Sequence, residues 1–353
     1  MSIAKRMYYQ AARLVNLSLL KGAAPTGILL PYHHLVSDEQ VPYVKHLYPY
    51  KGVKAFQRDL DYLLKHFKPV SLQEVIAAIR RQAPLPAHTF LLTFDDGLKE
   101  VAEVIAPLLR QKGIPAAFFL NSAFIDNRSL FYRFKISLLV EALLQPQSRA
   151  TLDALAEVLA QHKNGPLPGV ASPESSRPET LIQAVKRIRY HNRALTDAAG
   201  AVLGIDFNAW LAEHQPFMSS DQVRKLVEEG FAIGGHSIDH PYYQDLTLEE
   251  MLRQTTASVD MLAERFGLHY KAFAFPHSDA GIPKAFFDRL LQGPEPAVDV
   301  IFGTNNQRRD IYPGILHRFN CERPELDIAA AVKGILIYNR LQKVRGQSVI
   351  RRD

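Results

Sequence analysis

Short apolar runs alternate with segments of helical periodicity in the first and last thirds of the chain. The run at 88–96 is apolar on both faces and predicts a buried strand, and the segments 54–67 and 98–112 repeat apolar residues at helical spacing. Strands that alternate with helices predict βαβ units, and therefore a parallel sheet or barrel covered by helices. Further strands are expected within 27–35, 115–121, 231–235, 271–276 and 298–304, and further helices within 71–80, 219–230, 247–267, 283–292 and 324–345.

The alternation stops between residues 126 and 215. This stretch turns helical and polar, with a loop-like centre at 163–179, and predicts a helical subdomain or lid inserted into the α/β core. The predicted organisation is therefore an N-terminal helical segment, 1–26, a core of 27–320 interrupted by the insert, and a C-terminal helix with a basic tail, 321–353.

The composition is that of a soluble globular chain, with 47% hydrophobic and 22% charged residues among 353. The single cysteine, Cys321, excludes an intrachain disulfide and, with no clear signal peptide, favours the cytoplasm. No apolar run is long enough for a transmembrane helix, so a membrane span is not expected.

The net charge is +6, and much of the excess lies near the two ends of the chain. No nucleic-acid motif accompanies it, so nucleic acid is not an expected partner. Residues 5–21 are expected to form an amphipathic helix that packs against the core or a partner or, as the alternative, contacts a membrane surface. Solvated termini explain the charge most simply, and association with the inner membrane face stays open. The basic residues are Lys5, Arg6, Arg13, Arg340, Lys343, Arg345, Arg351 and Arg352.

Two polar motifs follow predicted strands, LLTFDDG at 91–97 and GGHSIDH at 234–240. The carboxyl ends of parallel strands form the edge at which α/β proteins place their sites, so the motifs are expected to meet there. Adjacent carboxylates are costly unless neutralised, and either a bound cation or a helix N-terminus would do this. One aspartate with two histidines makes an N/N/O ligand set with positions left for water and substrate. The two glycines are expected to let the strand end approach a metal closely.

The combination of TFDDG with the H-S-x-x-H-P pattern of 236–241 resembles the polysaccharide deacetylase family, the NodB-homology or carbohydrate esterase 4 group. The resemblance covers roughly 27–125 and 216–320. It implies an α/β fold, a distorted (β/α) barrel of about seven parallel strands that carries a helical insertion and binds one divalent metal ion.

The resemblance implies a role for each polar residue of the two motifs. Asp96, His236 and His240 would be the metal ligands, and Asp95 would be the general base that activates metal-bound water. Zinc is the first choice of metal, and cobalt, nickel and iron fit the same ligands.

The resemblance also implies a histidine that protonates the leaving amine. It lies in ILHRF, 315–319, which makes His317 the expected general acid, with a structural histidine as the alternative. The segment AFAFPHSD, 272–279, matches the family's third motif in part and lacks its arginine, and no Asp-Trp pair stands for the fourth motif. His33 or His34 of the YHH segment is a further candidate for the cleft. The expected substrate-binding residues are Phe275, Pro276 and His277.

The expected function is a metal-dependent hydrolase that removes the acetyl group from the nitrogen of an amino sugar in a glycan or glycoconjugate. Two alternatives stay open: hydrolysis of a non-sugar carbon–nitrogen bond, and a catalytically weak, carbohydrate-binding descendant. The intact set of Asp95, Asp96, His236 and His240 favours an enzyme, whereas the altered later motifs keep the weak descendant open.

Overall fold

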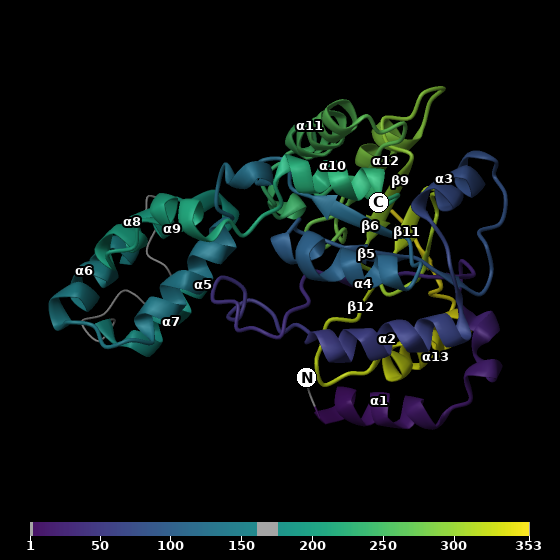
Figure 1. Ribbon diagram of the computed structural model, residues 1–353, viewed down its shortest axis with the longest axis horizontal. Helices are drawn as coiled ribbons and strands as arrows, with labels where there is room; N and C mark the ends of the chain where they lie inside the picture. Colours follow the sequence, from purple (N-terminus) through teal and green to yellow (C-terminus); the bar gives the residue numbers. More distant parts are fainter. Residues whose placement is uncertain (1–2, 161–175, 353) are drawn as a thin grey trace. The chain divides into compact units, whose positions relative to one another are not determined.

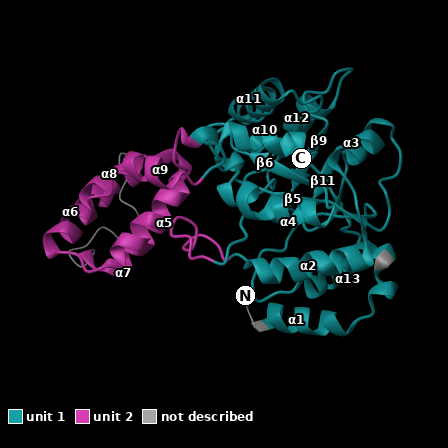
Figure 2. Cartoon of the chain, viewed as in Figure 1, with its two compact units in different colours: residues 1–38, 50–126, 217–353 teal, residues 39–49, 127–216 magenta. Residues whose placement is uncertain are grey.

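A computed structural model describes residues 3–160 and 176–352 of the chain. It divides into two compact units, one of residues 1–38, 50–126 and 217–353 and the other of residues 39–49 and 127–216 (Figure 2). The first unit contains the central sheet, and in the second unit the described elements are helices.

An eight-stranded parallel sheet forms the centre of the first unit (Figure 1). Its strands are short apolar runs buried on both faces, as parallel strands covered by helices require. All the strands predicted from the apolar runs are present. In order across the sheet, they are β11 (Ile315–His317), β9 (Val300–Gly303), β8 (Ala272–Ala274), β7 (Ala232–Gly235), β6 (Ala116–Leu120), β5 (Leu92–Phe94), β2 (Pro31–His33) and β12 (Phe319–Asn320).

The two edge strands of this sheet are consecutive in the chain, with only Arg318 between them. The Arg318 amide donates to the Gly303 carbonyl on β9 at 2.9 Å, and the Phe319 amide donates to the Leu30 carbonyl beside β2 at 3.0 Å. The segment 315–320 therefore joins both edges and nearly closes the sheet into a barrel. Because β11 and β12 form one continuous segment, the prediction of a distorted (β/α) barrel of about seven parallel strands is confirmed.

Successive side chains of each strand point alternately into and out of the barrel. Alanines of β6, β7 and β8 leave room inside for the rings of Phe119 and Phe302, whose centroids lie 5.2 Å apart. Larger apolar side chains on the outside pack against the surrounding helices (Figure 1). These helices are α2 (Val53–His66), α4 (Ala106–Gln111), α10 (Ser220–Glu228), α11 (Leu248–Phe266) and α12 (Lys284–Leu291), whereas the buried side chains of α3 (Leu72–Arg80) join the apolar cluster of the barrel interior.

Local sequence explains where several helices begin. Ser71, the N-cap of α3, accepts a hydrogen bond from the Glu74 amide at 3.2 Å, and the Glu74 carboxylate accepts one from the Ser71 amide at 2.8 Å. This capping box satisfies amide groups that the first turn leaves without helical partners. The helix expected from residue 98 begins at Lys99 and contains a π-helical turn, η3 (Val101–Ile105), that leads into α4.

Helices from the two ends of the chain pack together, α1 (Ile3–Leu14) and α13 (Ile328–Val344) (Figure 1). The Tyr8 hydroxyl donates to the Gly334 carbonyl at 2.6 Å, and a Cβ at Gly334 would lie 2.6 Å from the Tyr9 ring. Glycine at this position therefore permits the close approach of the two helices. Part of the predicted tail is ordered in a sheet, because β13 (Val349–Ile350) pairs in parallel with β10 (Arg309–Asp310).

A three-stranded parallel sheet has β4 (Thr89–Phe90) between β1 (Ile28–Leu29) and β3 (Lys68–Pro69). One residue separates β1 from the barrel strand β2, and one residue separates β4 from β5. No helix in the described residues is both long and apolar enough to cross a membrane.

The second unit corresponds to the predicted insert, with bounds of 127–216 in place of 126–215. It also includes the segment 39–49, which the sequence did not assign to it. Aromatic packing explains this addition, because the Tyr43 ring lies 5.0 Å from Phe134 and 5.6 Å from Trp210. Most of the predicted loop-like centre, residues 161–175, lies outside the described residues. The helices are α5 (Tyr132–Leu143), α6 (Arg149–Ala160), α7 (Pro178–Lys186), α8 (Leu195–Val202) and α9 (Phe207–His214).

Candidate active site

Three side chains that could hold a metal ion meet at the carboxyl ends of β5 and β7. The Asp96 Oδ1 atom lies 3.2 Å from His240 Nε2 and 3.6 Å from His236 Nε2. All three side chains are at most 5% exposed, and one ligand atom from each lies within 4.8 Å of the others. So compact an N/N/O set fits one divalent cation and leaves coordination positions for water and substrate.

The backbone at this site is held in uncommon conformations. Asp96, Ser237 and His240 have φ angles of 71°, 71° and 62°, in the left-handed region that costs a non-glycine residue ~1–3 kcal/mol. The Ser237 hydroxyl accepts a hydrogen bond from the His240 amide at 2.9 Å and so helps to hold this turn. The helix begins at Lys99, so Leu98, and neither Asp95 nor Asp96, occupies the N-cap position.

Surrounding groups orient His236 toward Asp96. The His236 Nδ1 atom donates to the Ala274 carbonyl at 2.8 Å, which turns Nε2 toward the carboxylate. Burial lowers the pKa of His236 to about 4, so its imidazole is neutral near pH 7, as a metal ligand must be. The side chain of Asn121 donates to the His236 carbonyl and, at 3.3 Å, to the Ser237 hydroxyl.

The two glycines before His236 serve packing and not the expected approach to the metal. A Cβ at Gly234 would lie 2.5 Å from the Phe119 ring, and one at Gly235 would lie 2.8 Å from Val259 of α11. Glycine is therefore required where β7 lies between the filled barrel interior and a covering helix.

Asp95 forms a bidentate ion pair with Arg318 inside the barrel. Arg318 Nη1 donates to Asp95 Oδ1 at 2.6 Å and Nη2 donates to Oδ2 at 2.8 Å, and Nη1 also donates to the Thr93 hydroxyl at 3.1 Å. Burial would raise the pKa of Asp95, but the charge of Arg318, then that of His236, and the Arg318 hydrogen bonds lower it below its ordinary value. The carboxylate is therefore ionised and fixed in orientation.

The two histidines of the YHH segment point in different directions. The His33 ring packs against Phe56 at 5.4 Å and Phe94 at 5.7 Å, in the core outside the barrel. Its side chain is buried, and burial holds its pKa well below the ordinary value. The side chain of His34 is 19% exposed. Of the two candidates, His34 is therefore the one that can meet substrate.

His34 is paired with a buried glutamate. Its Nδ1 lies 2.9 and 3.1 Å from the two carboxylate oxygens of Glu322, and the His34 amide donates to the same carboxylate at 2.8 Å. Burial lowers the pKa of His34, but Glu322, followed by Asp96 and Asp95, outweighs this effect and raises it to about 10. His34 is therefore an imidazolium near pH 7, within the electrostatic reach of both site carboxylates.

His317, the expected general acid, points away from this site. It shares the outer side of its strand with Ile315, whereas Leu316 fills the barrel. The His317 Nε2 atom lies 3.0 Å from Asp310 Oδ2, and the Asn305 amide donates to Nδ1 at 3.4 Å. The expectation that His317 acts on substrate is therefore corrected: its side chain is fully buried within a separate ion-pair cluster.

A model of the polysaccharide deacetylase family matches residues 82–192 and 201–286, more than half of the chain. The chain belongs to the polysaccharide deacetylase family. Membership supports de-N-acetylation of a glycan as the activity and a hydrolase of carbon–nitrogen bonds as the enzyme class. No curated protein matches this deacetylase significantly.

Solved structures include deacetylases with a similar fold. PplD, a deacetylase of Streptococcus pyogenes in complex with acetate, is 12% identical, is aligned over 88% of this chain and 99% of its own, and has a TM-score of 0.52. IcaB from Ammonifex degensii is 16% identical over 88% of this chain and 97% of its own, with a TM-score of 0.48. A de-N-acetylase from Aggregatibacter actinomycetemcomitans is 15% identical over 87% of this chain and 99% of its own, with a TM-score of 0.49. At 12% identity, the likeness to PplD concerns the fold alone.

The partial third motif of this deacetylase contributes one residue beside the site. Phe275 lies in the apolar cluster outside the barrel, and Pro276 is also buried, so the expected contact of Phe275 with substrate is corrected. The His277 ring lies 4.5 Å from that of His240 and stacks on Tyr242 at 3.7 Å. His277 and Tyr242 are partly exposed and so form a wall next to a candidate metal ligand.

Arg318 and Glu322, the partners of Asp95 and His34, were not predicted from the sequence. Both lie in the segment that closes the barrel, where Arg318, Asn320 and Glu322 occupy alternate positions. The intervening Phe319 and Cys321 belong to the outer apolar core. The alternation of polar and apolar residues over 318–322 could therefore have indicated a strand whose polar face points inward and whose apolar face points outward.

Proposed function

We propose that this protein is a metal-dependent deacetylase that hydrolyses the N-acetyl amide of an amino sugar in a glycan or glycoconjugate. The observation that carries the proposal is the buried group of Asp96, His236 and His240, with the ionised carboxylate of Asp95 beside it. A divalent ion held by the three ligands would supply Lewis acidity at the acyl carbonyl and the attacking water.

Asp95 is the proposed general base. Its carboxylate takes a proton from the water as the oxygen attacks the acetyl carbon. Arg318 is a positioning residue, because its two hydrogen bonds fix the plane of the carboxylate and its charge keeps the buried group ionised. This arginine stands in for the one that segment 272–279 lacks, which weakens the case for a catalytically inactive descendant.

His34 is the proposed general acid in place of His317. Glu322 holds Nδ1, so the Nε2 proton is the one that can pass to the leaving nitrogen as the carbon–nitrogen bond breaks. The products are then acetate and the free amine. Asp95 and His34 take opposite protonation states at neutral pH, as a base and an acid acting on one amide require.

The test combines metal analysis with acetate release from N-acetylglucosamine oligosaccharides. We expect the wild type to bind one divalent ion, with zinc first and cobalt, nickel or iron compared by reconstitution. Asp95→Asn should keep the metal and lose activity by ~10²–10⁴-fold, as should His34→Gln. His317→Gln is the matched control and should retain activity within a few-fold. The metal site would be overturned by a wild type that binds no metal. The assignment of Asp95 as the base would be overturned by an active Asp95→Asn variant. The assignment of His34 as the acid would be overturned by a His317→Gln variant that is as impaired as His34→Gln.

A further inference from the structure

The outward side of α1 carries apolar residues that nothing in the described chain covers. Met7 and Leu14, two helical turns apart, are 63% and 89% exposed, and Leu19 just beyond the helix is 66% exposed. The opposite side of the helix packs on α13 through Tyr8 and Ala12, so the exposed residues form a separate row. Large apolar side chains arranged in a row at helical spacing indicate a surface that meets an apolar medium.

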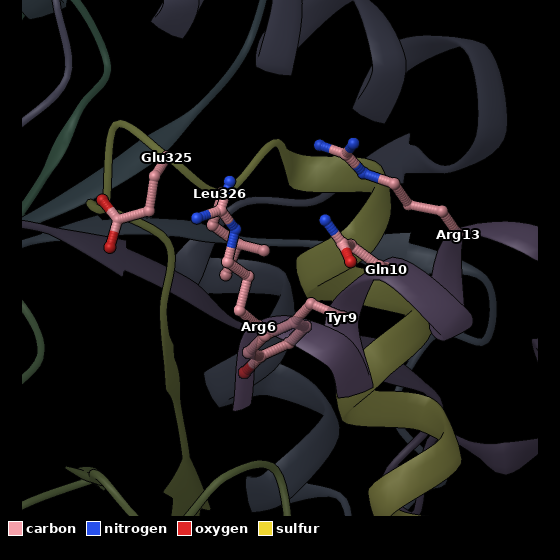
Figure 3. A pocket seen from close by; sticks show the side chains of 6 residues that line it. All are labelled: Arg6, Tyr9, Gln10, Arg13, Glu325 and Leu326. Carbon is pink, nitrogen blue, oxygen red and sulfur yellow. The ribbon is translucent and has the colours of Figure 1, made fainter. Parts of the chain in front are cut away.

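Basic residues lie next to this apolar row. Arg6 and Arg13 are also two turns apart and, with Gln10, Tyr9 and residues 325–326, line a cavity of about 360 Å³ (Figure 3). Arg13 pairs with Asp327, and Glu325 adds a second carboxylate at the rim. The helix itself contains three basic residues and no acidic one. The cavity therefore offers guanidinium groups to an anionic headgroup beside a row of apolar side chains.

The end of α13 repeats the same combination. Leu341 and Val344, one turn apart, are 46% and 86% exposed. Arg340, Lys343 and Arg345 stand among them and are exposed, whereas the last turns of this helix contain no acidic residue. Since α1 and α13 pack together, both sets of basic and exposed apolar side chains belong to one packed pair of helices.

We propose that α1, with the end of α13, docks on the surface of an anionic lipid bilayer. Met7, Leu14 and Leu19 would enter the boundary between headgroups and acyl chains, while Arg6 and Arg13 bind lipid phosphates. The charge selects this occupant, because Arg13 already pairs with Asp327, whereas Arg6 has no ion pair within the described residues and a purely apolar partner would cover it without supplying a counter-charge. The proposal goes beyond the hydrolytic function and does not depend on it.

Vesicle co-sedimentation of the full chain tests the proposal. Vesicles of phosphatidylcholine with phosphatidylglycerol should bind the protein about tenfold more than phosphatidylcholine alone, and added salt should reduce this binding. The double variant Met7→Glu/Leu14→Glu should lose binding, and Arg6→Gln should weaken it. Leu144→Glu in the second unit, at a residue 57% exposed, is the matched control and should bind as the wild type does.

Circular dichroism and light scattering accompany each variant. Arg6→Gln changes a single exposed side chain. If the double variant Met7→Glu/Leu14→Glu fails to fold, Arg6→Gln still tests the proposal independently. Equal binding to neutral and anionic vesicles, or wild-type binding by both α1 variants, would overturn the proposal. A wild-type dimer that the double variant converts to a monomer, without vesicle binding, would assign the surface to a second copy of the chain instead.

Discussion

Replacing Arg318 by methionine tests the ion pair that we place behind the general base. The substitution keeps much of the side-chain length but removes the counter-charge and both hydrogen bonds to Asp95, at 2.6 and 2.8 Å. The two side chains are 0% and 3% exposed, so water cannot replace the lost partner. Leaving one charge of a buried pair uncompensated costs about 3–5 kcal/mol of unfolding free energy. This is a large share of the ~5–15 kcal/mol that stabilises a typical domain.

The pH dependence of this loss has a definite sign. In the wild type, the pKa of Asp95 lies below its unfolded value because Arg318 and His236 outweigh burial, so the pair stabilises the fold above pH ~4 and this stability is lost as pH falls. Without Arg318, burial dominates and the pKa of Asp95 rises. The difference in unfolding free energy between wild type and Arg318→Met should therefore be largest at neutral pH and become smaller in acid. The acidic limb of the pH–rate profile of Arg318→Met should lie at higher pH than that of the wild type.

Two measurements test these effects. Denaturant unfolding of the metal-free proteins at several pH values gives the stability difference, and pH–rate profiles of the reconstituted enzymes give the position of the acidic limb. Asp95→Asn/Arg318→Met removes the charge together with its partner and should recover much of the stability that Arg318→Met loses. Arg318→Lys keeps a charge without the bidentate geometry and should fall between the two. A cost below ~1 kcal/mol for Arg318→Met, or a double variant as unstable as the sum of its parts, would refute the assigned pair.

Two further predictions concern the proposed acid, His34, and β7, the strand that precedes the candidate metal ligands His236 and His240. Glu322→Gln removes the main cause that raises the pKa of His34 to about 10, so the basic limb of the pH–rate profile should move to lower pH, and an unmoved limb would exclude His34 as the acid. Gly234→Ala would place a Cβ 2.5 Å from the Phe119 ring and should cost ~1–3 kcal/mol in denaturant unfolding, whereas Gly22→Ala, with no atom within 4 Å, is the control and should change stability little.

The metal-ligand group was predictable because each half of it is local in sequence. TFDDG and HSIDH each follow an apolar run, and the alternation of strands with helices places both at the same edge of a parallel sheet. The position of the inserted unit in the chain was predictable for a similar reason, since its helical sequence interrupts the alternation of strands and helices. Segment 39–49 could not be assigned to it from sequence, because packing of Tyr43 against Phe134 and Trp210 depends on tertiary contacts.

The groups that tune the base and the acid depend instead on how the barrel closes. Arg318 reaches Asp95 across 223 positions of sequence, and Glu322 reaches His34 across 288. Neither pair follows from spacing, because closure of the barrel by segment 315–320 brings them together. The absence of an arginine from segment 272–279 therefore does not leave Asp95 without a partner, since Arg318 of the closing segment forms its ion pair.

The same closing segment explains why one histidine was assigned the wrong role. A strand repeats every two residues, so Leu316 inside the barrel requires Arg318 to point inward and His317 outward. An acid at His317 would need a register shift of one residue, which would move Arg318 away from Asp95 and Leu316 out of the barrel core. The geometry that pairs Arg318 with Asp95 thus directs His317 away from Asp95. It also directs Glu322, two further inward positions along, to His34, so one strand supports both proton-transfer groups.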